Sequence, residues 1–166
     1  MVLGMSLATF TLLHVVISLI GIGSGVVVLW GLLASKPLNG ITAIFLITTI
    51  LTSVTGFMFP FEHVTPGIIL GVISLVLLAF AVLGRYALHL NGSWRAIYVV
   101  TAGLSLYLNV FVLIVQLFAK VPALHALAPQ GKEPPFAIAQ LIVLVTFLAL
   151  IFLATKKFHP ERSRLA

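Results

Sequence analysis

Histidine is the residue type in this chain best suited to chemistry, and one of the five histidines lies inside a long apolar stretch. It is His14, in the segment LATFTLLHVVISLIGIGSG. An ionisable side chain in such a stretch is costly and usually marks a functional site. Imidazole binds zinc, copper and haem iron, and it exchanges a proton near neutral pH. His14 is therefore the first candidate for a cofactor ligand or a proton-handling residue.

Small residues follow His14 along one face of the expected helix, with Gly21 and Gly25 about two and three turns further on. Together these glycines form a GxxxG pattern, which permits close helix approach and would leave room for a flat macrocycle such as haem b. The alternative is that the glycines only pack against a neighbouring helix and that His14 bonds Thr55, Gln116 or water. Both interpretations stay open on the sequence.

A divalent metal would need further ligands from the connecting segments. The candidate set is His14 with Glu62, His63 and His125, which would have to converge from separate parts of the chain. Their spacing matches no zinc signature, and the chain has no cysteine. A haem held by two histidines would require His63 to reach down to the depth of His14. The alternative is that the loop residues simply face solvent.

Amide side chains form the third group. Asn109, Gln116 and Gln140 stand in apolar stretches, where they could bind the carbonyl of a quinone or the polar end of a lipid. The alternative is a hydrogen bond between helices, which contributes about 0.6 kcal/mol in membrane proteins. We keep Gln116 and Gln140 in the candidate site because they share the depth of His14.

The elements that must position these residues are membrane helices. The hydrophobic fraction is 61%, the charged fraction is 7% and the mean hydropathy is +1.27, which indicates an integral membrane protein. We expect a single all-α bundle over residues 1–166 with a short basic tail at 156–166. Each span is close to or longer than the ~20 residues that cross a bilayer. The five predicted spans are 7–33, 41–59, 66–88, 94–119 and 136–155.

Charge predicts the orientation of the bundle. Seven of the nine Lys and Arg residues fall on one side of the five spans and two on the other, which places the N-terminus outside and the C-terminus in the cytoplasm. The basic residues are dispersed, so we expect no nucleic-acid partner. His14, Thr55, Gln116 and Gln140 then share the outer half of the membrane.

The sequence predicts that residues 93–120 form the central helix. Their polar and small residues fall within roughly 40° of one helix face, which should point towards protein, ligand or trapped water. The fifth span is apolar apart from Gln140 and should be peripheral. The proline-rich loop before it should lie in the interface or fold over the outer end. The residues of the polar stripe are Tyr98, Ala102, Ser105, Asn109, Gln116 and Lys120.

The first span, in which LHVV leads into GIGSG, resembles uncharacterised families of small bacterial multi-span membrane proteins that are similar to b-type cytochrome helical bundles. The segment NVFVLIVQLFAKVPALHALAP, followed by EPPFAIAQ, is similar to the same kind of chain. The resemblance implies a bacterial inner-membrane protein linked to respiratory electron transfer or oxidase assembly. The cytochrome pattern extends only to His14 and the glycines beyond it.

Two functional hypotheses follow. In the first, the bundle surrounds an outward-facing polar pocket that binds a metal, haem, quinone or lipid. In the second, the chain is a structural or assembly subunit of a larger membrane complex, and its polar stripe contacts a partner helix. The sequence contains no recognisable nucleophile–base pair, so it assigns no reaction and leaves open whether the chain is an enzyme.

Overall fold

The computed structural model describes residues 2–61 and 65–160, and its architecture is helical. Five helices in this part of the chain are long and apolar enough to cross a membrane. The helix bounds differ from the predicted spans by at most three residues, at the end of the second helix. These five helices are α1 (Leu7–Leu33), α2 (Asn39–Gly56), α3 (Pro66–Val82) with the π-helical turn Leu83–Ala87, α4 (Trp94–Lys120) and α6 (Pro134–Lys157).

Local sequence signals set the beginnings of these helices. The Ser6 hydroxyl caps α1 by accepting the Thr9 N–H, and Thr65 caps α3 in the same way. Proline occupies the first turn of α3, α5 (Pro122–Leu127) and α6, where its missing N–H costs nothing. The apolar loop between α4 and α6 thus contains a short helix of its own.

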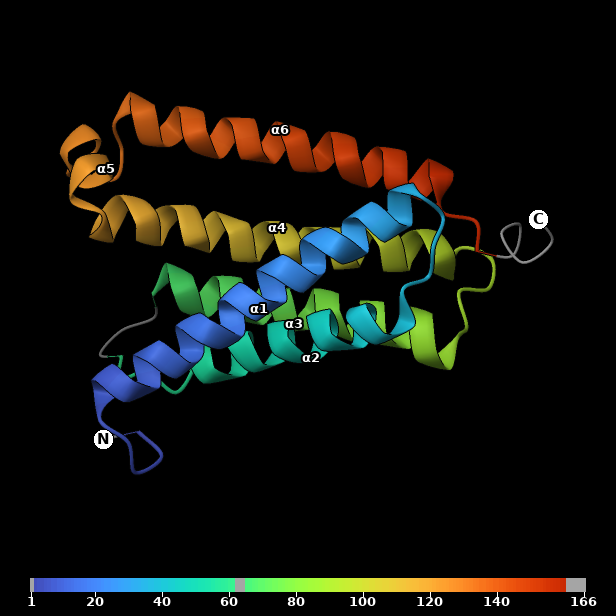
Figure 1. Cartoon of the computed structure of the whole chain (residues 1–166), viewed down its shortest axis with the longest axis horizontal. Coiled ribbons are helices and arrows are strands. Elements are labelled where there is room, and N and C mark those ends of the chain that lie inside the picture. Colours follow the sequence, from blue (N-terminus) through green and yellow to red (C-terminus); the bar gives the residue numbers. More distant parts are fainter. Residues whose placement is uncertain (1, 62–64, 161–166) are drawn as a thin grey trace.

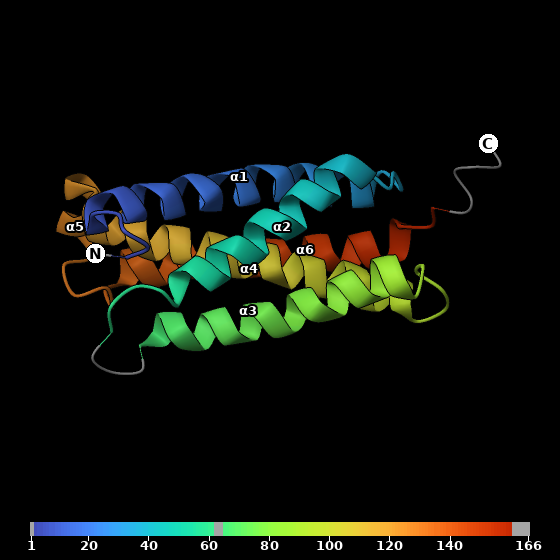
Figure 2. The same cartoon turned by 90° about the horizontal axis from the view of Figure 1, so that it is seen from below.

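Helix α4 is the centre of the bundle. It contacts α3, α2, α1 and α6, and these four also contact one another in sequence around it, from α3 to α2, α2 to α1 and α1 to α6 (Figures 1 and 2). The polar stripe on α4 faces inward at Tyr98 and Ser105, both fully buried. The prediction of a central fourth helix is therefore confirmed.

The bundle has two chemically different ends. At one end, called the basic end here, α1, α3 and α6 finish and α2 and α4 begin (Figure 1). The other end is called the N-terminal end because α1 begins there. The basic end holds five of the described cationic residues, which are Lys36, Arg85, Arg95, Lys156 and Lys157.

The hydrophobic core lies mainly in the half of the bundle nearest the basic end. Tyr98, Phe45 and Phe158 are its largest fully buried side chains. They pack with aliphatic residues of α1, α3, α4 and α6. Burying such side chains contributes roughly 1.5–3 kcal/mol each in water, and close packing takes over that role within lipid. The buried cluster comprises Val28, Leu29, Leu32, Phe45, Leu46, Leu78, Ala81, Tyr98, Val99, Ala102, Leu106, Phe147, Ile151, Ala154 and Phe158.

Arg95 attaches α6 to the centre of the bundle. Its Nη1 donates to the carbonyl oxygens of Thr155 and Phe158, at 2.9 and 2.6 Å. These carbonyls lie at the C-terminus of α6, where intrahelical partners run out and the helix dipole favours a cation. Otherwise α6 is mostly uncovered, because only 6% of its most apolar 18-residue segment is buried. This is expected for a peripheral helix.

Candidate functional site

His14 is held by α2. Its Nδ1 lies 2.8 Å from Oγ1 of Thr55, and the Thr55 hydroxyl lies 2.7 Å from the carbonyl oxygen of Leu51. A hydroxyl has one hydrogen, and here that hydrogen points to a carbonyl that can only accept. With its hydrogen on that carbonyl, Thr55 accepts the proton on Nδ1 of His14. This assignment leaves Nε2 as the ring nitrogen free to accept a proton or to bind a ligand.

Aromatic and small residues surround the His14 ring. The Phe59 ring meets it edge to face at a centroid distance of 5.3 Å, and Phe10 packs on Phe59 at 5.0 Å. A Cβ atom added at Gly56 would lie 3.8 Å from Cε1 of His14, so the imidazole sits against the backbone of α2. His14 itself is half-buried. The ring is fixed in position and still reaches the edge of the packed region.

A third helix places a positive charge at the same end of the bundle as His14. Lys120, the last residue of α4, is near enough to interact electrostatically with the imidazole, and its own side chain is exposed. Thus α1, α2 and α4 place an imidazole, a hydroxyl and an ammonium group at the N-terminal end, and the hydroxyl is bonded to the imidazole. We call His14, Thr55 and Lys120 the imidazole cluster.

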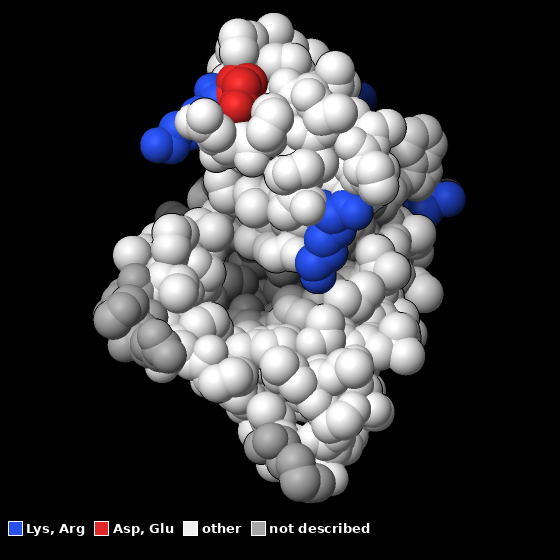
Figure 3. All heavy atoms as spheres, turned by 90° about the vertical axis from the view of Figure 1, so that its left-hand side faces the viewer, with Lys and Arg blue, Asp and Glu red and all other residues white. Residues whose placement is uncertain are grey.

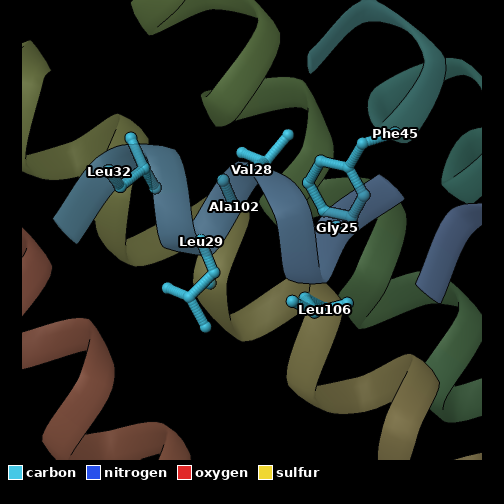
Figure 4. Close-up of a pocket in the computed structure, with 8 residues that line it drawn as sticks. Gly25, Val28, Leu29, Leu32, Phe45, Ala102 and Leu106 are labelled. Atoms are coloured by element: carbon cyan, nitrogen blue, oxygen red, sulfur yellow. The ribbon is translucent and has the colours of Figure 1, made fainter. Parts of the chain in front are cut away.

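The glycines beyond His14 face protein. Hydroxyl oxygens of Thr48 and Thr49 would lie 3.2 and 3.3 Å from a Cβ atom added at Gly21. At Gly25 the corresponding distances are 2.5 Å to Leu106 and 2.8 Å to Phe45. Figure 4 shows these two side chains beside Gly25, and the residues that line this region leave no room for a water molecule. The space considered for a macrocycle is occupied by side chains.

The three amides have different surroundings. Asn109 donates weakly to Oγ1 of Thr49, at 3.5 Å, and Gln140 donates to the carbonyl of Phe111 at 3.2 Å. The Oε1 atom of Gln140 is buried without a hydrogen-bond partner. Gln116 is exposed, although Tyr98, Ala102 and Ser105, further along the polar stripe towards the basic end, are buried. The amides of α4 thus become more accessible towards the N-terminal end.

This change in burial reflects an opening of the bundle. Along the stripe, Tyr98 and Ser105 are fully buried, Asn109 is half-buried, and Gln116 and Lys120 are exposed. Figure 3 looks onto the N-terminal end and shows a hollow between the helix ends, with a Lys or Arg side chain at its edge. The packed half of the bundle therefore gives way to an open, more polar half.

The metal ligand set is not assembled in the part of the chain that the structure describes. Among those residues, no group of three or more His, Asp or Glu side chains could hold a metal ion. His125 lies on α5 with its side chain exposed. Glu62 and His63 lie outside the described residues. The described geometry therefore gives no support to a metal or haem at His14.

Glu133 has a local role in its loop. Its carboxylate accepts the backbone N–H of Lys132 at 2.9 Å and that of Gln130 at 3.0 Å. These bonds stabilise the charged form and lower the pKa of Glu133 below its ordinary value of 4.5. The carboxylate therefore closes the turn that leads into α6.

Sequence reasoning placed Arg85 at the level of the lipid phosphates but did not predict its partners at the basic end. Arg85 is 8% exposed, and its Nη1 and Nη2 atoms donate to the Tyr98 hydroxyl and to Oδ1 of Asn39, at 3.2 and 2.7 Å. The available signal was a lone arginine at the end of an apolar span, with an asparagine at the start of another.

Comparison with protein-family models, curated proteins and solved structures gives no match to this chain.

Proposed function

We propose that this chain is a multi-pass protein of the bacterial inner membrane whose outward-facing hollow binds a quinone. The basic end faces the cytoplasm in this proposal, in keeping with the positive-inside rule. The observation that carries it is the imidazole cluster. There His14 is fixed through Nδ1 and keeps Nε2 available, at the end of the bundle that opens.

The groups at this end favour a ligand with oxygen acceptors. Lys120 offers N–H donors, Gln116 offers an exposed amide, and His14 can donate or accept at Nε2 according to its protonation. Glu133, the described carboxylate at this end, is engaged by the N–H groups of its own loop. Quinone carbonyls match these donors, and a quinol oxygen can pass its proton to an imidazole.

The route to the site supports a lipid-soluble ligand. Gln116 lies within a membrane-spanning helix and is exposed at the surface of the bundle, so its amide would face lipid in an isolated chain. Such a side chain needs a polar partner in the membrane. A ligand that arrives through the bilayer would supply that partner and continue into the hollow.

The test is equilibrium binding of a short-chain ubiquinone to the detergent-purified protein and to His14→Gln. The variant keeps an amide near Thr55 but loses the second ring nitrogen. We expect saturable binding by the parent protein and about tenfold weaker binding by the variant, the equivalent of about 1.4 kcal/mol for one hydrogen bond. His125→Gln is the matched control, because His125 is an exposed histidine beside the same end.

Other outcomes identify the alternatives. Equal binding by the parent protein and His14→Gln would refute the role of the imidazole cluster. A phospholipid found in the hollow in place of quinone would overturn the ligand class. Failure to bind any small molecule, with loss of a co-purifying membrane partner in His14→Gln, would favour an assembly subunit. An absorption spectrum before and after dithionite, together with metal analysis of the same sample, tests haem and metal directly.

A further inference from the structure

The basic end contains a buried positive charge for which the described residues supply no counter-charge. Arg85 is 8% exposed and lies in the π-helical turn that ends the third span. Its two hydrogen-bond acceptors, Asn39 and Tyr98, are neutral. Of the three acidic residues, Glu62 and Glu161 lie outside the described residues, and Glu133 lies at the opposite end of the bundle.

A buried guanidinium without an anion is unfavourable. Neutral hydrogen bonds and aromatic faces reduce the desolvation penalty of a charge, but they do not neutralise it. Two such faces are present, with the guanidinium carbon 5.1 Å from the centroid of the Tyr98 ring and 5.8 Å from that of Tyr86. Arg95 differs, because its N–H bonds go to helix C-terminal carbonyls, where a cation is favoured.

The neighbourhood of Arg85 has the other features of a phosphate site. Arg85 bonds the first residue of α2, a helix whose N-terminus has no side-chain cap. The first N–H groups of such a helix lack intrahelical partners and attract anions. A Cβ atom at Gly40 would have nothing within 4 Å, so there is open space beside this terminus. Lys36 is exposed in the segment just before it.

The depth of Arg85 favours a lipid as the source of the phosphate. Trp30 and Tyr86 are 73% and 48% exposed at the same end of the bundle. Exposed aromatic rings at the ends of membrane helices mark the level of the lipid head groups. A lipid phosphate at that level can reach a guanidinium at the end of a span, and the planar guanidinium matches phosphate oxygens.

We infer that Arg85, with the N-terminus of α2, binds the phosphate of an anionic phospholipid in the leaflet that meets the basic end. This site is distinct from the imidazole cluster, and it does not depend on a quinone in the hollow. The lipid phosphate supplies the negative charge that Asn39 and Tyr98 lack. Arg85 thereby makes the folded bundle more stable in a membrane that contains anionic lipid.

The test compares thermal midpoints in nanodiscs of phosphatidylcholine alone and of phosphatidylcholine mixed equally with phosphatidylglycerol. We expect phosphatidylglycerol to raise the midpoint of the parent protein. In Arg85→Gln that increase should disappear. Lys157→Gln, which removes an exposed cation at the same end, should keep it. Native mass spectrometry should find one retained phosphatidylglycerol per chain in the parent protein and in Lys157→Gln, but none in Arg85→Gln.

A second variant distinguishes lipid binding from a purely structural role and covers failure of Arg85→Gln to fold. Asn39→Asp replaces the acceptor of Arg85 by a carboxylate of the same shape. If Arg85 needs a lipid phosphate, Asn39→Asp stabilises the protein in phosphatidylcholine and loses both the phosphatidylglycerol effect and the retained lipid. If Arg85 only connects helices, Asn39→Asp stabilises equally in both nanodiscs, and the inference is wrong.

Two further results would overturn the assignment. If inorganic phosphate added to the detergent-purified protein reproduced the whole phosphatidylglycerol effect, the site would bind the free ion. Retention of the midpoint increase and of the bound lipid in a folded Arg85→Gln would mean that the lipid binds elsewhere.

Discussion

Replacement of Gly25 by alanine tests whether α1 packs against α2 and α4 as closely as the structure indicates. A Cβ atom at this position would lie 2.5 Å from Cδ1 of Leu106 and 2.8 Å from Cε2 of Phe45. Carbon atoms in contact are normally about 3.5–4.0 Å apart, so both side chains would have to move by roughly 1 Å. Overpacking of this kind costs about 1–3 kcal/mol.

Gly23 provides the matched control. It lies on the same helix, is exposed, and has no atom within 4 Å of its added Cβ. Gly23→Ala and Gly25→Ala share the helix-propensity gain of up to ~1 kcal/mol, so their difference isolates the clash. We expect Gly25→Ala to be less stable than Gly23→Ala by about 1–3 kcal/mol. The measurement is the free energy of unfolding in mixed micelles titrated with sodium dodecyl sulfate.

The comparison also tests what occupies the face of α1 beyond His14. If the two variants agreed to within ~0.5 kcal/mol, the range of an ordinary surface substitution, Phe45 and Leu106 would not fill this space. The region beside Gly25 would then be open to a ligand, and the close packing described for the basic half would be wrong. A large difference would leave no room there for a flat cofactor.

Two further predictions concern the ends of α6. The N–H groups of Lys132 and Gln130 lower the pKa of Glu133, so this interaction stabilises the loop above pH 4.5 and is lost as the pH falls through the lowered pKa. The backbone amide NMR signals of Gln130 and Lys132 should shift in that acidic range in the parent protein but not in Glu133→Gln. Signals that do not change with pH would contradict the hydrogen bonds to Glu133. Arg95→Met should cost about 1.5–3 kcal/mol, because two helix carbonyls lose a charged donor. Hydrogen exchange at the C-terminus of α6 should accelerate in Arg95→Met and not in Lys157→Met; equal exchange would refute the attachment.

The number of spans and their limits could be predicted because each depends on local properties. Long apolar runs identify the helices, and Thr65, Pro66 and Pro134 mark where two of them begin. The inward face of α4 could also be predicted, since Tyr98 and Ser105 share a side of one helix, and both are buried. Membrane insertion and orientation remain predictions.

The contacts of the site depended on how the helices cross. Thr55, Gln116 and water were equivalent partners for His14 on the sequence, and the packing of α1 on α2 selects Thr55. The same packing places side chains against Gly21 and Gly25. The helical periodicity of the sequence could not predict whether protein or a ligand would lie there. Arg85 and Asn39 are 46 residues apart in the chain, so their bond required the assembled bundle.

Hydroxyl side chains explain how the N-terminal half of the bundle can remain open. Thr48, Thr52 and Thr55 donate to carbonyls of their own helix at 2.7, 2.9 and 2.7 Å, so α2 needs no neighbouring helix to satisfy them. Each oxygen can still accept another hydrogen bond, as Thr55 does from His14. The apolar core near the basic end fixes the helices in position. The hydroxyls of Thr48 and Thr52 can therefore meet a ligand without first giving up a bond to another helix.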